Sequence, residues 1–163
     1  MILTKISKVL EIENCNKDVL IKSMYKSDFW EAINPTKKME AKFIAPNVLY
    51  TKIYDQISVV NVPIEMEGEL VLSDEGEQGE KGRLIDFNVR NNKDVKTLEG
   101  RIRVKSLSST KSKIGVFVES LILTSDFLNL IGGAADLILQ MKITDMLRNL
   151  EKYCKSNDLK QFL

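Results

Sequence analysis

Alternation of apolar and charged residues, repeated along most of this chain, is the feature that most restricts how it folds. Within Ile64–Leu72 the even-numbered positions are apolar or glycine, and three of the odd-numbered positions are glutamates. Within Thr97–Lys105 the even-numbered positions are again apolar or glycine, and the odd-numbered ones include two arginines and a lysine. Successive side chains of a strand point to opposite faces, so the pattern predicts strands with one buried and one solvated face. One-sided burial is typical of an antiparallel sheet.

The same period of two predicts seven strands, which are separated by turn-forming residues. Short helices are expected only after the first strand: one over Lys17–Tyr25, begun by the N-cap Asn16, and a second begun by Ser27. The second helix ends before Asn34 and Pro35, because the residue before a proline disfavours helix. The predicted strands are Ile2–Ile12, Met39–Ile44, Val48–Ile57, Ile64–Leu72, Arg83–Val89, Thr97–Lys105 and Ile114–Leu123.

A long helix is predicted for the C-terminal part, because apolar residues recur at helical spacing from Phe127 to Tyr153. At 1.5 Å per residue such a helix is about 40 Å long, enough to cross the whole sheet. Gly132 and Gly133 fall within it, and each is expected to cost about 1 kcal/mol relative to alanine. Three explanations remain open: a close approach of the backbone to the sheet or to a ligand, a bend, or a later start of the helix.

These elements define an α+β fold, in which a seven-stranded antiparallel sheet wraps a long C-terminal helix and two short helices follow the first strand. The chain of 163 residues is long enough to bury a core. It shows no linker, repeat or low-complexity segment, so residues 1–163 are expected to form a single domain.

Charge and cysteine content limit the partners and the compartment. Twenty-four basic and 23 acidic residues give a formal charge of +1. This argues against nucleic acid as a partner, because a protein that binds the phosphate backbone needs an excess of basic residues. The most apolar stretch, Phe127–Met141, is shorter than the roughly 20 residues of a membrane span and contains Asp136. The alternating, charged N-terminus does not resemble a signal peptide. Cys15 and Cys154 fit no disulfide framework or metal motif, which predicts free thiols and a cytoplasmic location.

The solvent faces of the predicted strands carry complementary charges. A row of glutamates on Ile64–Leu72 and a row of basic residues on Thr97–Lys105 flank a strand that carries Asp86 and Arg90. Cross-strand pairing explains the basic row without any partner, and we favour that interpretation over an anionic partner.

No catalytic or metal-binding motif stands out, and no cofactor is expected. The sequence contains no histidine, which removes the Ser-His-Asp and Cys-His mechanisms and nearly all catalytic zinc sites. Gly76, Gly79 and Gly82 match neither a phosphate-binding loop nor a dinucleotide fingerprint, and predict a long solvated loop over Ser73–Gly82. Glu119 lies in a segment that is apolar on both faces, where a buried carboxylate would be a candidate acid or base. We favour a solvent-facing position for it.

The order of elements resembles the helix-grip fold of the superfamily that includes START lipid-transfer domains, the Bet v 1 plant allergens and polyketide cyclases, also called SRPBCC. The resemblance covers essentially the whole chain. Local similarity is found in the strand-to-helix segment Glu13–Trp30, in Val62–Gly68 and in the helix end Met146–Tyr153. The resemblance implies a curved sheet and a helix that enclose an apolar cavity, which opens near the short helices.

Known members of this superfamily hold lipids, sterols, polyketides or plant hormones, and some act as enzymes. The carbon monoxide dehydrogenase G-like branch, tied to a redox enzyme's assembly or cofactor supply, has a similar layout. The superfamily has no invariant catalytic set, so the resemblance implies no catalytic residue in this chain.

We therefore predict a protein that binds or carries a hydrophobic small molecule (lipid-like, quinone or polyketide-like) in an internal cavity. Aromatic residues are expected mostly on the concave side of the sheet, where Tyr50 and Tyr54 would offer hydroxyls to the ligand. The short helices and the loop after Ile44 would form the gate. The predicted lining consists of Trp30, Phe43, Tyr50, Tyr54, Met66, Phe87, Ile102, Phe127, Ile131, Ala135 and Ile138.

Two other functions remain open. An enzyme of the cyclase or dehydratase type would use Tyr50, Tyr54 or Glu119 in place of histidine. A protein-interaction module would have a packed core and act through the sheet surface or as a homodimer. Binding without catalysis is the interpretation that we favour.

Overall fold

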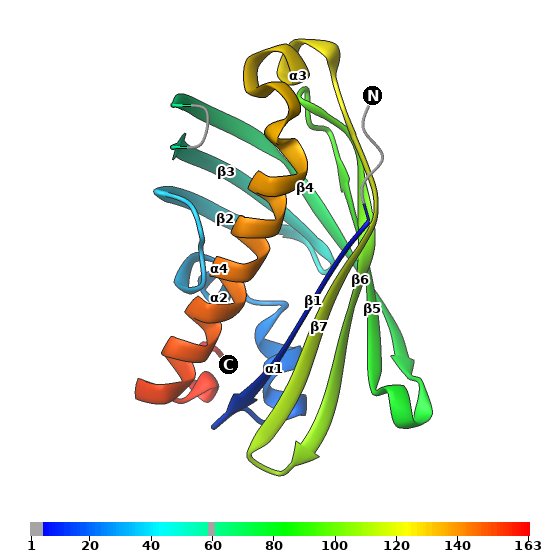
Figure 1. The fold of residues 1–163 in the computed structure, drawn as a ribbon. Helices are drawn as coiled ribbons and strands as arrows, with labels where there is room; N and C mark the ends of the chain where they lie inside the picture. Colours follow the sequence, from blue (N-terminus) through cyan, green and yellow to red (C-terminus); the bar gives the residue numbers. More distant parts are fainter. Residues whose placement is uncertain (1–4, 59–60) are drawn as a thin grey trace.

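The computed structural model describes residues 5–58 and 61–163 of the chain. One curved sheet of seven strands forms the largest part of the structure, and the long C-terminal helix runs along its concave side (Figure 1). This arrangement confirms the predicted α+β fold. The elements in chain order are β1 (Ile6–Glu13), α1 (Lys17–Ser23), α2 (Ser27–Ala32), β2 (Lys38–Ala45), β3 (Val48–Ile57), β4 (Val62–Glu77), η1 (Gly79–Lys81), β5 (Arg83–Arg90), β6 (Val95–Ser108), β7 (Lys111–Leu123), α3 (Ser125–Ile131), η2 (Gly132–Ala134), α4 (Ala135–Ser156) and η3 (Leu159–Phe162).

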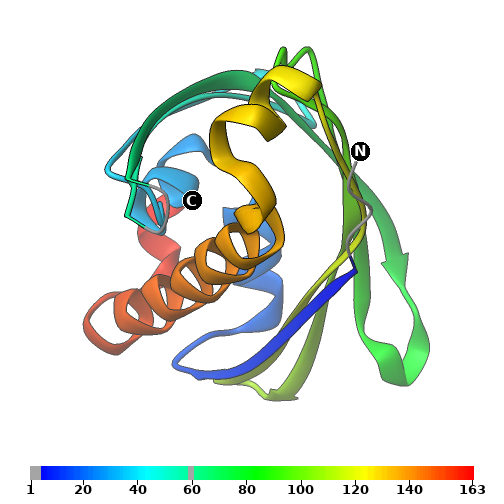
Figure 2. The same ribbon diagram turned by 45° about the horizontal axis from the view of Figure 1, so that its top comes forward.

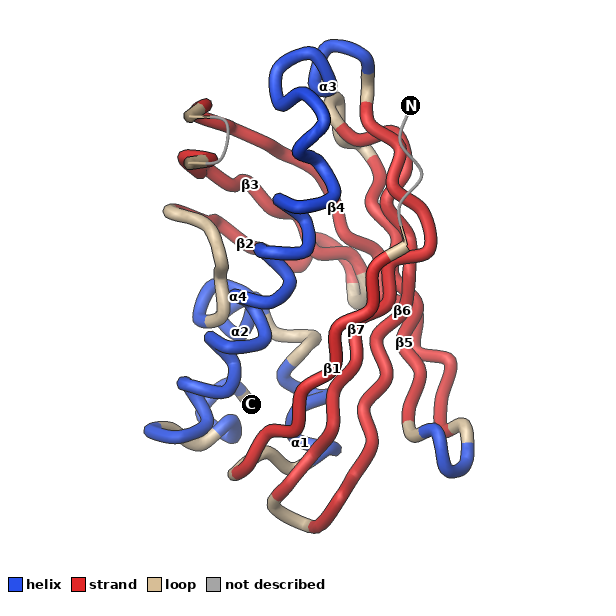
Figure 3. Tube along the Cα trace, viewed as in Figure 1, coloured by secondary structure: helices blue, strands red, loops and turns tan. Residues whose placement is uncertain are grey.

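The sheet is a meander from β2 to β7, and β1 is added beside β7. Neighbouring strands are antiparallel throughout, in the order β1-β7-β6-β5-β4-β3-β2. Figures 2 and 3 show that the sheet curves around the helices, so that all of them lie on its concave side except the short η1 turn. Ile2, where the first strand was predicted to begin, lies outside the described residues.

The strand register places the alternating apolar residues on one face, as the sequence pattern predicts. Ile53 pairs with Met66, and both belong to the set of side chains that face the concave side. Leu72 pairs with Phe87, which continues this face across the centre of the sheet. Because each strand keeps its parity across these pairs, the concave face is largely apolar and the convex face carries most of the charges.

The two short helices after β1 are confirmed, but only one of their predicted caps is. The Asn16 side chain accepts a hydrogen bond from the Val19 N–H at 3.1 Å and begins α1. Ser27 is already the first helical residue of α2, and Lys26 occupies the N-cap position without a side-chain hydrogen bond. The Ser27 hydroxyl oxygen instead accepts the Phe43 N–H at 3.0 Å, so it fastens α2 to the neighbouring strand β2.

The long loop predicted over Ser73–Gly82 is wrong, because the sheet continues through the first half of it. Strand β4 extends to Glu77 through a bulge between Asp74 and Gly76, and Gly76 adopts a φ of +84° there. The Arg83 guanidinium donates to both carboxylate oxygens of Asp74 at 2.8 to 3.1 Å. These bonds hold the pKa of the Asp74 carboxyl below its usual value. A bulge that contains a glycine interrupts the alternation of apolar and polar residues, so the sequence pattern does not predict the strand pairing that continues beyond it.

The predicted C-terminal helix is divided by its glycines. Gly132 has φ +64° and ψ −146°, a conformation that glycine adopts at little cost, and the chain turns there between α3 and α4. A Cβ atom added at Gly132 or Gly133 would meet nothing within 4 Å. Among the three explanations, a close approach of the backbone to the sheet is therefore wrong for the described residues, and a bend followed by a later helix start is correct.

Charge pairing across strands is found on the convex face, but within the basic row it involves only Arg101 among the described residues. Arg90 on β5 donates to Glu69 on β4 at 2.8 Å, and Lys52 on β3 lies 3.7 Å from Glu65 on β4. Arg101 of the basic row pairs with Glu119 of β7. The glutamate row is thus paired with its neighbouring strands.

Candidate ligand-binding site

The interior between sheet and helices contains two separate clusters of fully buried apolar side chains. The first, called here the α1 cluster, surrounds α1, α2 and the C-terminal half of α4, and includes Ile12, Leu20, Phe29, Val104 and Leu150. The second, called the α3 cluster, lies at the opposite end of the sheet and includes Ile64, Leu121, Phe127, Ile131 and Ala135. Figure 1 shows α1 and α3 at these two ends.

Between the two clusters lies a zone of inward-facing apolar side chains that are only partly buried. Leu98 of β6 and Leu139 of α4 pack against both clusters, and both remain partly accessible to solvent. Half-buried apolar side chains of β3, β4, β5 and α4 face the same interior. We call this zone the intermediate belt; its members are Ile53, Met66, Leu70, Phe87, Leu98, Ile138 and Leu139.

Nine of the predicted lining residues lie inside the fold. They are distributed over the two clusters, their margins and the belt. Met66, Phe87 and Ile138 belong to the belt. Phe43 is half-buried beside the α1 cluster, where its ring stacks on that of Tyr25 with centroids 6.3 Å apart. The fully buried ones are Trp30 and Ile102 in the α1 cluster, and Phe127, Ile131 and Ala135 in the α3 cluster.

Trp30 has a structural role that its sequence position does not reveal. Its indole Nε1–H donates to the Met24 carbonyl at 2.8 Å, and its ring meets Phe29 edge to face at 5.4 Å. These contacts fix the turn between α1 and α2 and satisfy the only polar atom of the side chain.

Phe87 owes its position in the belt to a glycine on the neighbouring strand. It pairs with Gly100 of β6, and a Cβ at Gly100 would lie 2.9 Å from the Phe87 ring and 2.0 Å from the Phe117 carbonyl oxygen. Only glycine leaves room for the aromatic ring to lie across β6 at this point.

The expected placement of Tyr50 and Tyr54 on the concave side is wrong. Both share the parity of Lys52 on β3, so they lie on the convex face. The Tyr50 hydroxyl hydrogen-bonds to Glu67, and this bond is the main cause that raises the pKa of Tyr50. Tyr54 is 43% exposed. Their aromatic character suggested burial, whereas their parity with a lysine indicated the solvent face.

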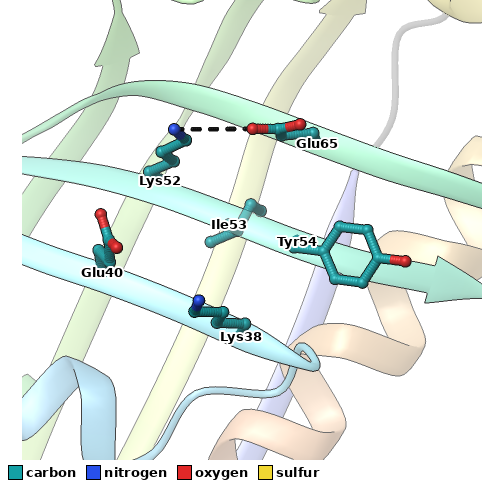
Figure 4. Close-up of a pocket in the computed structure, with 6 residues that line it drawn as sticks. All are labelled: Lys38, Glu40, Lys52, Ile53, Tyr54 and Glu65. Atoms are coloured by element: carbon teal, nitrogen blue, oxygen red, sulfur yellow. Dashed lines mark ion pairs between the residues drawn. The ribbon is translucent and has the colours of Figure 1, made fainter.

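Tyr54 is one of the residues that line a surface pocket on the convex face (Figure 4). Its lining is largely charged, and the Lys52–Glu65 ion pair spans it, so its chemistry differs from that expected for an apolar ligand. Lys38, Glu40, Lys52, Ile53, Tyr54 and Glu65 line this pocket.

Glu119 is solvent-facing, as favoured from the sequence. Its side chain is 53% exposed and forms an ion pair with Arg101, whose guanidinium also lies over the Phe117 ring at 5.5 Å. Register shifts between Glu99 and Gly100 of β6, and Glu119 stands at the extra position of β7. The carboxylate is therefore part of a convex surface cluster.

An ion pair at the edge of the belt was missed in the sequence. Asp55 faces inward from β3, with a side chain only 7% exposed, and its carboxylate lies 2.5 Å from the Lys142 ammonium on α4. The Asp55 carboxylate also accepts the Gln56 N–H at 2.9 Å, and Lys142 donates to the Pro35 carbonyl at 3.2 Å. Parity with Ile53 marked Asp55 as inward-facing, and this was the available signal.

A second polar group inside the fold is the Tyr25 hydroxyl, near the α1 cluster. It is buried and has no hydrogen-bond partner among the described residues. Burial is the main cause that raises the pKa of Tyr25, with a further contribution from the Asp74 carboxylate.

No protein-family model and no curated protein matches this sequence, whereas many solved structures match the fold. A START superfamily protein from Mycobacterium smegmatis is 12% identical, with 93% of this chain and 97% of that chain covered and a TM-score of 0.66. The Zhui aromatase/cyclase from Streptomyces sp. R1128 is 10% identical, with coverages of 98% and 93% and a TM-score of 0.61. Norcoclaurine synthase from Thalictrum flavum is 13% identical, with coverages of 96% and 88% and a TM-score of 0.64.

Identities this low establish the fold alone, and the chain shares the helix-grip fold of these three structures. The similarity to the carbon monoxide dehydrogenase G-like branch stays a prediction. In the part of the chain that the structure describes, none of the helices combines the length and the apolar character that a membrane crossing requires.

Proposed function

We propose that this protein binds or carries a hydrophobic small molecule, lipid-like, quinone-like or polyketide-like, against the intermediate belt. The observation that carries the proposal is the incomplete burial of inward-facing apolar side chains between two fully buried clusters. A chain that packs both ends of its interior to completion leaves the centre in contact with solvent. A ligand would supply the missing apolar partner there.

Burial of apolar area is the expected source of affinity. Removing such surface from water contributes about 25 cal/mol per Å², so a ligand that covers the belt gains affinity from area alone. The Asp55–Lys142 pair at the edge of the belt is suited to orient one polar group of that ligand, because apolar sites achieve specificity with a few fixed polar groups.

The first test is native mass spectrometry of the purified protein, followed by solvent extraction of the bound material. We expect a near-stoichiometric apolar compound, or saturable uptake of a fluorescent fatty acid by protein that was purified empty. A bare mass together with no uptake of the probe would contradict the proposal and favour an interaction module with a packed core.

A matched pair of variants on β3 locates the site. Ile53→Trp places a large side chain in the belt. Tyr54→Trp places the same side chain at the adjacent position, on the convex face of the sheet. We expect Ile53→Trp to weaken uptake of the probe by about tenfold or more, and Tyr54→Trp to leave it unchanged. Ile138→Trp on α4 repeats the test from the opposite wall if the strand variant does not fold. Unchanged uptake in both interior variants would place the probe elsewhere.

The alternative of a cyclase or dehydratase was based on residues that do not face the interior. Tyr50, Tyr54 and Glu119 all lie on the convex face, away from the belt. Binding without a catalytic step is the function that these positions support best.

A further inference from the structure

Two cysteines that are distant in the sequence meet inside the α1 cluster. Cys15 lies in the link between β1 and α1, and Cys154 lies in the last turns of α4. Both are completely buried, and their side chains are in hydrogen-bonding contact with each other. The proposed ligand-binding function does not use either thiol.

The backbone around the two thiols is fixed on both sides. The Asn14 side-chain amide donates to the Cys154 carbonyl at 2.7 Å, so the residue before Cys15 is bonded directly to α4. The Cys15 N–H donates to the Thr110 carbonyl at 2.9 Å, and the Ser112 hydroxyl donates to the Cys15 carbonyl at 2.6 Å. Three elements of the fold thus hold the pair together.

We propose that Cys15 and Cys154 are a site of reversible oxidation, at which an intrachain disulfide joins the β1–α1 link to α4. A disulfide requires an S–S distance of about 2.05 Å, so the two sulfur atoms must approach more closely than in the hydrogen-bonding contact that they make in this structure. The oxidant that the proposal requires is a peroxide, and hydrogen peroxide is the smallest one able to enter a buried site.

The chemistry balances with one peroxide per disulfide. The hydrogen bond from Cys154 is the main cause that lowers the pKa of Cys15, whereas the contact with Cys15 and burial raise the pKa of Cys154. The Cys15 thiolate attacks peroxide, the O–O bond breaks, and a sulfenic acid and hydroxide form. The Cys154 sulfur then attacks the Cys15 sulfur, and its proton leaves with the displaced hydroxyl as water. Two thiols are oxidised, and one peroxide is reduced to two waters.

The test uses the full chain, treated with hydrogen peroxide and analysed by intact mass under denaturing, non-reducing conditions. We expect each molecule to lose the mass of two hydrogen atoms, and peptide mapping to link residues 15 and 154. Both thiols should become unreactive to a maleimide together and recover with dithiothreitol. Because the bond closes a loop that spans most of the chain, the unfolding midpoint should rise by about 5–15 °C.

Complete burial makes a kinetic prediction as well. Oxidation should be slow in buffer and faster in urea below the unfolding transition, since the thiols react only when the C-terminal end opens locally. The variant Cys154→Ser should yield the Cys15 sulfenic acid, which a dione reagent traps. In wild-type protein, a gain of oxygen atoms without hydrogen loss, a crosslink between chains, or an unchanged unfolding midpoint after oxidation would overturn the proposal. The wild-type comparison decides the question even if the serine variant does not fold.

Discussion

The α1 cluster and the intermediate belt are built from the same kinds of side chain but reach different degrees of burial. Leu20 and Leu150 in the α1 cluster are at most 1% exposed, whereas Leu70 and Leu139 in the belt remain partly accessible. The apolar content of the two regions therefore does not explain the difference. What differs is how much of the chain lies opposite the sheet at each place.

Helices cover the concave face unevenly. At one end α1, α2 and η3 add to the C-terminal half of α4, and Phe29 meets Phe162 edge to face at 5.7 Å. Among the described residues, α4 alone lies opposite the middle of the sheet, and its most extensive contacts with the strands are with β1 at the edge (Figure 2). The end with several helices supports the fold, and the middle with a single helix is where we propose that a ligand binds.

The largest expected effect is a difference between two leucines of the same helix. Leu150→Ala removes a fully buried side chain from the α1 cluster and should lower the free energy of unfolding by about 3 kcal/mol. Leu139→Ala removes a half-buried side chain from the belt and should cost about 1 kcal/mol, because less buried surface and a smaller void are involved. Urea denaturation of both variants measures the difference. Equal losses would mean that the belt is packed as tightly as the α1 cluster.

The sequence predicted the fold well because the alternation is local information. Strand β3 was predicted with its exact bounds, and the parity of Met66, Leu70 and Phe87 correctly placed them on the concave face. The C-terminal end of β4 was missed because a bulge interrupts the period while pairing continues.

The site was less predictable, because it depends on what lies opposite each residue. Tyr50 was assigned by its aromatic character against the parity of its own strand. The Asp55–Lys142 pair and the contact of Cys15 with Cys154 join segments that only the folded chain brings together. Without knowledge of tertiary pairing, each of these residues looked like a solvated charge or an isolated thiol.

A smaller effect is expected at the glycine pair that directs α3 into its cluster. Gly132→Ala forces a Cβ into a conformation that is essentially restricted to glycine and should cost about 2 kcal/mol. Gly133→Ala is the matched control, because it has open space and lacks the positive φ, and should be neutral or slightly stabilising. Thermal unfolding of the two variants distinguishes them. Equal stability would show that α3 does not depend on the turn at Gly132 to bury Phe127 and Ile131.

The smallest effect is expected for the Asp55–Lys142 ion pair, which lies at the edge of the belt. Lys142→Met leaves the Asp55 carboxylate buried without its ammonium partner and should lower the free energy of unfolding by about 1 kcal/mol, since Lys142 itself is partly exposed. Asp55→Asn should cost less, because the lysine is free to turn toward water. A double-mutant cycle with urea denaturation measures the coupling, which we expect at about 1 kcal/mol. Zero coupling would mean that the Asp55–Lys142 ion pair does not hold α4 against β3. The edge of the belt between α4 and β3 would then be open even without a ligand.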